Sequence, residues 1–195
     1  ALQLFAGLIV HGILAEVLTR SPGLILLNTN YVKKVVFPLA ILPVIPLGSA
    51  LFHAAISSLV LIVAQLLVVG SLPWTFWMLP IVLLPLIVLA MGISWLLASL
   101  GVFLRDIGQT MGLIATMLLF LSPIFYPISA LPESFHGVIH ANPLTFIIEQ
   151  TRIVLIEGRL PDMVGLLSYL AVALVVAWFG FAWFQKTRKG FADVL

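Results

Sequence analysis

Few side chains in this sequence could carry out acid–base or metal chemistry. His136 and His140 are four residues apart beside Glu133, a spacing that would place both imidazoles on one helix face, where they could bind a metal ion. Gly137 lies between them and weakens the helix that such a site would need, so we do not predict a metal site there. The chain has no cysteine, no Gly-rich phosphate loop and no plausible nucleophile–base pair. The sequence therefore predicts no catalytic residue and no cofactor bound by this chain.

Ionisable groups are also rare within the long apolar stretches. His53 stands near Ser49 and Ser57, and a lone histidine among serines is more typical of a hydrogen bond between helices than of a metal ligand. Glu16 and Arg20 are four residues apart, a favourable orientation for an ion pair on a helix surface. Ion-coupled transporters and intramembrane enzymes usually have ionisable groups at membrane depth. If this protein moves a substrate, the energy must therefore come from elsewhere.

The composition identifies the solvent in which these residues must fold. Of 195 residues, 63% are hydrophobic and 8% are charged, against about 25% charged residues in an ordinary soluble domain. The mean hydropathy is +1.26 and the net charge is only +2. These values exclude a soluble enzyme and a disordered chain, and the scattered Lys and Arg residues exclude a nucleic-acid-binding protein. The sequence predicts an all-α integral membrane protein.

Long stretches without charge define the membrane crossings. Residues 35–104 contain no Lys, Arg, Asp or Glu, and neither do residues 107–132 and 163–185. A helix needs about 20 apolar residues to cross the hydrocarbon core, so the first stretch holds two crossings and each of the others holds one. A further apolar run opens the chain. The five predicted crossings are residues 1–19, 47–69, 77–100, 107–122 and 163–184.

The distribution of charge predicts which side of the membrane each connection faces. With five crossings, seven of the nine basic residues fall on one side: Arg20, Lys33, Lys34, Arg105, Lys186, Arg188 and Lys189. The other two, Arg152 and Arg159, fall on the opposite side together with four acidic residues. Because short cytoplasmic connections are enriched in Lys and Arg, the seven-residue side is predicted to be cytoplasmic. The C-terminus is then cytoplasmic as well.

Two segments do not fit simple crossings. Residues 29–38 are short, apolar on one side and basic on the other, which is typical of a helix that lies at the membrane interface or docks on a partner. The same pattern also suits a plain connection whose two lysines reach the headgroups and only set the topology. From the residues alone, both interpretations of this segment stay open.

The second exceptional segment is residues 123–160, on the predicted outer side. Asn142 and Pro143 supply an N-cap and a proline in the first helical turn, and Gly158 supplies a stop. The short apolar pieces in this region suggest a re-entrant hairpin that dips back into the membrane, which requires shielding by protein or by a water-filled cavity. The alternative is a peripheral hairpin at the interface that only anchors the chain.

Four sequence motifs resemble those of a known family, the membrane-spanning permease subunits of bacterial ABC-type polysaccharide exporters, which export lipid-linked O-antigen, capsule or teichoic acid chains. The motifs occur in the family's order and extend over nearly the whole chain: NYVKKVVFP at 30–38, followed by ILP at 41–43, then VFLRDIG at 102–108, LSPIFYP at 121–127 and NPLT at 142–145.

The resemblance implies a fold and partners. Family permeases have six crossings and form homodimers in the bacterial cytoplasmic (inner) membrane, and each subunit pairs with a cytoplasmic ABC ATPase subunit that binds ATP and Mg. Only five crossings are visible here, and the chain starts within an apolar run at Ala1. We therefore expect a further crossing and an amphipathic helix to precede it. The implied substrate is a lipid-linked polysaccharide.

The resemblance also assigns roles to particular residues. Segment 29–38 matches the element that transmits ATPase motion, and the connection at 105–106 matches a second ATPase-facing loop. The residues implied in ATPase coupling are Tyr31, Lys33, Lys34, Phe37, Pro38, Arg105 and Asp106. Region 123–158 matches the short helices that close the outer mouth of the channel. The candidates for the substrate channel or outer gate are Phe125, Tyr126, Asn142 and Pro143.

Two other functions remain alternatives. The same architecture could export a drug or another small amphiphile, or the protein could be a membrane scaffold that transports nothing. A neighbouring cluster of glycosyltransferase genes would favour polysaccharide export, and a multidrug setting would favour the small amphiphile. The lack of a neighbouring ATPase gene would favour the scaffold.

Overall fold

In a computed structural model of the chain, the described residues are 1–33, 38–125, 137, 139 and 142–194. All the regular elements within these ranges are helices, and none is a strand. The predicted all-α class is thereby confirmed.

Four helices are long and apolar enough to cross a membrane: α1 (Leu2–Arg20), α4 (Val44–Val69), α5 (Leu79–Phe103) and α9 (Met163–Thr187). A fifth apolar helix, α6 (Ile107–Leu121), has 15 residues. At 1.5 Å per residue it spans about 22 Å, less than the roughly 30 Å of a hydrocarbon core. The five predicted crossings thus correspond to four long helices and one short one.

Prolines explain where two of these helices begin. The sequence predicted a crossing from residue 47, whereas α4 starts at Val44 and carries Pro46 in its first turn. Pro80 occupies the same kind of position in α5. Proline is tolerated there because the first backbone N–H groups of a helix have no acceptor within that helix. Pro85, by contrast, lies inside α5 and removes one of its hydrogen bonds.

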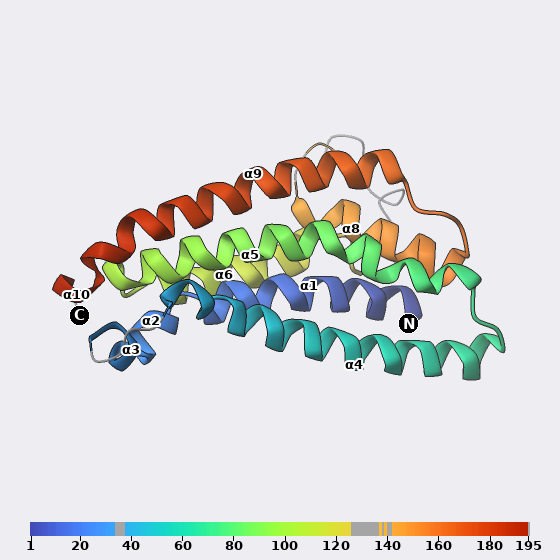
Figure 1. Ribbon diagram of the computed structural model, residues 1–195. Coiled ribbons are helices and arrows are strands. Elements are labelled where there is room, and N and C mark those ends of the chain that lie inside the picture. Colours follow the sequence, from blue (N-terminus) through green and yellow to red (C-terminus); the bar gives the residue numbers. More distant parts are fainter. Residues whose placement is uncertain (34–37, 126–136, 138, 140–141, 195) are drawn as a thin grey trace.

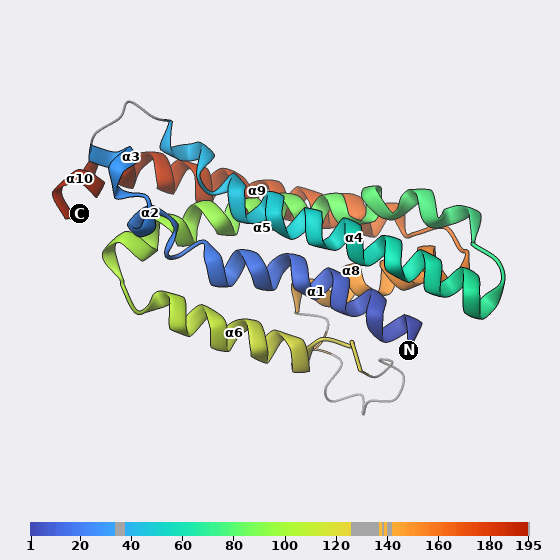
Figure 2. The same cartoon turned by 90° about the horizontal axis from the view of Figure 1, so that it is seen from below.

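Shorter elements gather at the two ends of the bundle (Figures 1 and 2). At one end lie α2 (Leu24–Leu27), α3 (Thr29–Lys33), the 3-10 turns η1 (Leu39–Ile41) and η5 (Arg188–Gly190), and α10 (Phe191–Val194). Towards the other end lie the 3-10 turn η2 (Trp74–Met78), α8 (Pro143–Arg152) and the π-helical turn η4 (Ile153–Glu157).

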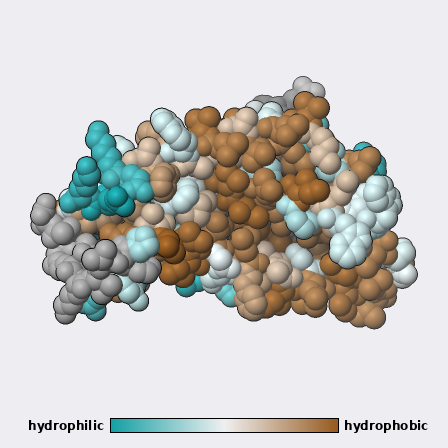
Figure 3. Space-filling view, in the orientation of Figure 1, coloured by the Kyte–Doolittle hydropathy of each residue, from teal (hydrophilic) through white to brown (hydrophobic). Residues whose placement is uncertain are grey.

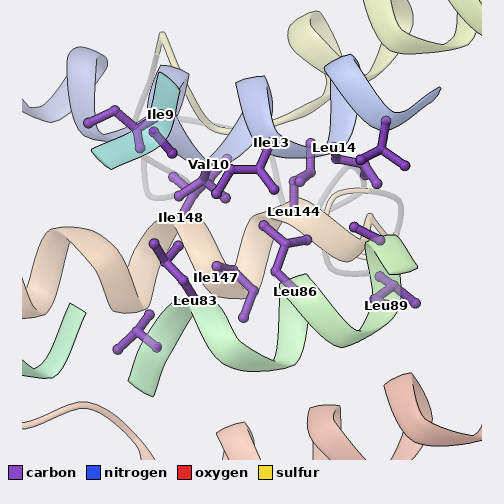
Figure 4. Close-up of a cluster of buried hydrophobic side chains, with 14 of the residues drawn as sticks. Ile9, Val10, Ile13, Leu14, Leu83, Leu86, Leu89, Leu144, Ile147 and Ile148 are labelled. Carbon is purple, nitrogen blue, oxygen red and sulfur yellow. The ribbon is translucent and has the colours of Figure 1, made fainter. Parts of the chain in front are cut away.

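Helix α5 is at the centre of the core. It makes its most extensive contact with α9 and also packs against α1 and α8. Figure 4 shows side chains of α1, α5 and α8 meeting in one apolar cluster, in which Ile13, Leu86, Leu144, Ile147 and Ile148 are fully buried. The short helix α8 is therefore enclosed by the long helices instead of lying on the surface of the molecule.

The outward faces are apolar, as a lipid environment requires. Helices α4 and α9 bury the smallest share of their residues among the long helices. Figure 3 shows hydrophobic side chains across the middle of the molecule and hydrophilic ones gathered where α9 ends. Trp74 and Trp77 are exposed on the turn after α4, in keeping with the enrichment of tryptophan at the membrane–water interface.

Candidate functional site

The described part of the predicted ATPase-coupling segment lies at the end of the bundle that also holds the C-terminus (Figure 1). Tyr31 lies in α3 with an exposed side chain, and Lys33 is the last residue of that helix. Lys34 and Phe37 fall outside the described residues. Pro38 is exposed and immediately precedes η1. The described part of the segment is thus short and helical, and it lies at one end of the molecule.

Arg105 and Asp106, the second predicted coupling element, form the exposed turn between α5 and α6. The backbone carbonyl of Asp106 accepts hydrogen bonds from the amides of Gln109 and Thr110, at 3.1 and 3.4 Å, and so starts α6. The Asp106 side chain makes no capping hydrogen bond. Figures 1 and 2 show this turn at the same end of the bundle as α3. Two candidates that are distant in sequence thus share one face.

A second apolar cluster lies beneath this face. Phe191 of α10 is fully buried, and its ring meets the ring of Phe184 edge-on at a centroid distance of 5.6 Å. The cluster consists of Leu24, Ile25, Leu42, Ala98, Val102, Phe184 and Phe191. Leu24 and Ile25 precede the candidate coupling segment in the chain and Leu42 follows it, so the cluster packs both flanks of the segment against Phe191 of α10. Phe191 was not predicted as a core residue, because the short stretch after the last apolar helix has too few residues to show a periodic apolar pattern.

At the other candidate site, Asn142 positions the start of α8. Its side-chain oxygen accepts a hydrogen bond from the amide of Leu144 at 2.9 Å, and its Nδ2 donates to Oγ of Ser122 at 2.9 Å. The hydroxyl of Tyr169 on α9 donates to the Pro143 carbonyl at 2.8 Å. The predicted N-cap and first-turn proline are confirmed, and Gly158 ends the π-helical turn η4, which continues α8, in a left-handed conformation with φ of 69°.

Replacing Asn142 by alanine removes both the cap and the bond to Ser122. We expect it to lower the free energy of unfolding by about 2 kcal/mol, since a lost cap costs about 1 kcal/mol and the bond to Ser122, whose hydroxyl still donates to the Leu118 carbonyl, contributes about 1 kcal/mol more. Asn142→Ser keeps a side-chain oxygen that can cap the helix, adds no charge and loses the Nδ2 donor, so it should cost about half as much. Thermal unfolding in detergent tests the order of the two variants. Equal midpoints for both variants and the wild type would contradict the assigned roles.

Phe125, the outer-gate candidate next to the end of α6, is half exposed. Its ring stacks on that of Phe120, with a centroid distance of 6.1 Å and an interplanar angle of 26°. Tyr126 falls outside the described residues. The two phenylalanines present a continuous aromatic surface to the outside of this chain.

Arg152, at the end of α8, was predicted only as one of the charges on the outer side of the membrane, and the structure gives it specific partners. Its Nε donates to the Gln3 carbonyl at 3.1 Å and its Nη2 donates to the Ile124 carbonyl at 2.9 Å. Burial lowers the pKa of this guanidinium, and the nearby Glu149 carboxylate opposes that shift. Arg152 thereby joins α8, the start of α1 and the turn after α6. These bonds could not be predicted, because both acceptors are backbone carbonyls far from Arg152 in the chain.

The π-helical turn that follows Arg152 is held from another element. Thr75 of η2 is fully buried, and its hydroxyl donates to the Val154 carbonyl at 2.6 Å. A π turn interrupts the regular helical hydrogen-bond pattern, so an outside donor helps to stabilise it. This bond ties the outer connection between α4 and α5 to the end of the α8–η4 unit.

A polar cluster joins α1 to α4. Both oxygens of Glu16 are used: one accepts from Arg20 and the other is 2.9 Å from Nδ1 of His53. Arg20 also donates to Oγ of Ser49 at 2.8 Å. The predicted Glu16–Arg20 pair and the predicted role of His53 as a hydrogen-bonding residue between helices are confirmed. The Glu16 partner of His53 was not predicted, because the two residues are 37 positions apart.

Metal ligation finds no support in the described part of the chain, where no three His, Cys, Asp or Glu side chains come together. His136 and His140, the pair considered from the sequence, fall outside the described residues.

Comparisons with known proteins all indicate one family of transporters. The sequence model of the ABC-2 type transporter family matches residues 2–156. An O-antigen export system permease protein RfbA of Klebsiella pneumoniae is 30% identical over 200 residues, covering 100% of this chain and 75% of that protein. The polysialic acid transport protein KpsM of Escherichia coli is 24% identical over 196 residues, covering 95% of this chain and 72% of that protein.

Proposed function

The chain belongs to the ABC-2 type transporter family, and we propose that it is the permease subunit of an ATP-driven exporter of lipid-linked polysaccharide. The observation that carries the proposal is the similarity to an O-antigen export permease along the whole chain. A second relative named for polysialic acid transport supports a glycan as the substrate. The location that follows is the bacterial cytoplasmic membrane, with the C-terminus in the cytoplasm.

The energy for export comes from a separate subunit. Two copies of a cytoplasmic ABC ATPase bind ATP and Mg and pair with a homodimer of this chain. The end of the bundle that carries exposed Tyr31, Arg105 and Asp106 faces the ATPase. Its excess of basic residues supports this orientation, since such residues remain on the cytoplasmic side. Pro38 is exposed at the same end, and Lys33, Lys34 and Phe37 of the coupling segment are also proposed to have a role in pairing with the ATPase.

The outer gate is built from aromatic and positioning residues. Sugars can stack their C–H faces on aromatic rings, so a glycan path needs rings more than charges. Phe125, half exposed and stacked on Phe120, supplies such a surface, and Tyr126 is proposed as a second aromatic residue of the gate. Asn142 is buried with its amide oxygen and nitrogen both bonded, so its contribution, like that of Pro143, is to hold α8 in place.

Reconstitution tests the proposal directly. The full-length permease and its ATPase subunit are placed in proteoliposomes with the ATP-binding side outward, and lipid-linked O-antigen is added to the outer leaflet. We expect ATP-dependent protection of the glycan from an external glycosidase, and no protection with an ATPase subunit that cannot hydrolyse ATP.

The same preparation separates the alternatives. Uptake of a fluorescent amphiphile without glycan protection would favour a drug exporter. Binding of no ATPase subunit and transport of neither substrate would favour a scaffold. Either outcome would refute polysaccharide export.

The coupling role of the basic segment predicts a further result. Lys33→Glu together with Lys34→Glu should lower glycan export and ATP hydrolysis in the complex by about tenfold, because like charges would then face the ATPase surface that pairs with these lysines. Lys189→Glu, one charge on the C-terminal turn, is the comparison. Accessibility labelling must first show that the variant keeps its orientation. Unchanged hydrolysis and export would remove the two lysines from the mechanism.

A further inference from the structure

The chain segments before and after the candidate coupling element are both fastened to one turn of α5. The hydroxyl of Ser21 donates to Oγ of Ser94 at 2.9 Å, and Ser94 in turn donates to the Pro43 carbonyl at 2.8 Å. One helical position further, Trp95 Nε1 donates to the Ala40 carbonyl at 3.0 Å. Ser21 precedes the element in the chain, and Ala40 and Pro43 follow it. A displacement of the coupling segment would therefore act on Ser94 and Trp95 both through the chain before it, at Ser21, and through the chain after it, at Ala40 and Pro43.

Burial makes the bonds of Ser21 and Ser94 costly to break. Ser21 and Ser94 are fully buried, and a buried hydroxyl left without a partner costs about 1–3 kcal/mol. A neighbouring contact allows little sliding, because a Cβ added at Gly101 of α5 would lie 1.9 Å from the Pro22 carbonyl oxygen. The backbone around Pro22 is thus in direct contact with α5 at Gly101, seven residues after Ser94. The attachment has little freedom to move independently of α5.

The same helix reaches the outer gate. Leu86 and Leu89 of α5 lie eight and five residues before Ser94, and they pack with Leu144 and Ile147 of α8 in the cluster shown in Figure 4. Leu86, Leu144 and Ile147 are fully buried. Close packing of this kind transmits a displacement because it leaves little empty space to absorb it. One continuous helix thus connects the ATPase-facing end to α8.

We propose that Ser94 and Trp95 are positioning residues that carry the movement of the ATPase-facing segment through α5 to the outer gate. The inference rests on the proposed function, since it assumes an ATPase at the basic end of the molecule. It goes beyond that function by assigning the coupling to two residues within a membrane crossing, neither of which faces the ATPase or α8.

The test uses the full permease–ATPase complex in proteoliposomes, with both ATP hydrolysis and glycan export measured. Ser94→Ala removes the hydroxyl that bonds to Ser21 and to Pro43, and Trp95→Phe keeps an aromatic ring but removes its N–H donor. We expect the ATPase to copurify and hydrolysis to continue, while export per ATP hydrolysed falls about tenfold, within the 5- to 150-fold range of typical coupling free energies.

Two matched controls are available. Ser58→Ala removes a buried hydroxyl that bonds only to its own helix, at the Ala54 carbonyl. Trp178→Phe alters a tryptophan of α9 that is 71% exposed. Both should keep the wild-type ratio of export to hydrolysis.

Three outcomes would overturn the inference: an unchanged ratio in both variants, a parallel fall in hydrolysis and export, or loss of the ATPase from the complex. The last two would mean that the bonds only maintain the fold. Failure of the proposed function is distinct, because the wild-type complex itself would then hydrolyse ATP without exporting the glycan.

Discussion

Replacing Gly180 by alanine is expected to disrupt the α5–α9 interface and lower the free energy of unfolding by about 3 kcal/mol, the upper part of the usual range for overpacking. A Cβ at this position would lie 2.1 Å from the Gly92 carbonyl oxygen. A Cβ at Gly92 would in turn lie 2.6 Å from Cα of Ala177. The obstructing atoms belong to the backbones of two long helices, so relief requires the helices themselves to move apart.

The measurement is the amount of protein that accumulates in the membrane and its unfolding midpoint in detergent. Gly48→Ala and Gly112→Ala are the controls, because a Cβ at either helical position would meet no atom within 4 Å. Both controls should be neutral or gain up to about 1 kcal/mol from the higher helix propensity of alanine. A Gly180→Ala midpoint equal to those of the controls would contradict this account of the interface.

The second large effect is expected at Arg152. Arg152→Gln removes two charge-assisted hydrogen bonds to the Gln3 and Ile124 carbonyls, and should cost about 3 kcal/mol if each contributes about 1.5 kcal/mol. Arg152→Lys keeps the charge but lacks the forked geometry that serves both carbonyls, so its cost should be intermediate. The loss should loosen the junction of α8 with α1 and with the turn after α6.

Two measurements check this expectation. Unfolding midpoints give the order of the three proteins, and a single cysteine at Ile124, in a chain that otherwise has none, reports on the junction. Ile124 is almost fully buried, so its labelling by an impermeant maleimide should be slow and should accelerate severalfold when Arg152 is lost.

Arg159→Gln is the matched control for this experiment. Its guanidinium pairs with Glu157 at an exposed site, and exposed pairs contribute about 0–1 kcal/mol. A labelling rate at position 124 that does not respond to Arg152→Gln, or that responds equally to Arg159→Gln, would show that Arg152 does not hold the junction.

Local patterns predicted the local features of the candidate sites. The N-cap at Asn142, the proline after it and the glycine stop at Gly158 could be read from the sequence, because caps and left-handed turns depend on residues within one or two positions. The Glu16–Arg20 pair is predictable for the same reason, since a helix places residues four apart side by side. The predicted starts of α4 and α5 were less accurate, because prolines there form part of the first helical turn.

Long-range partners were not predictable. His53 contacts Glu16, Ser94 contacts Ser21, and Arg152 contacts the carbonyl of Ile124. Each pair comes from different elements, and two of the acceptors involved at these sites, at Gln3 and Ile124, are backbone carbonyls that every residue possesses. A sequence pattern shows that a polar side chain lies in an apolar stretch, but it does not show which group forms a hydrogen bond with it.

The amino-acid sequence by itself determined that this chain is a helical membrane protein, approximately where its long apolar helices lie and which connections share an end of the bundle. It could do so because lipid admits only backbone that satisfies its own hydrogen bonds, and because charge is expensive within it. The tertiary structure alone decided which faces of the helices meet. Helices that are apolar on all sides carry no periodic signal of their buried face, so the contacts were set by close approach at Gly92 and Gly180 and by a few polar side chains that found partners on other helices.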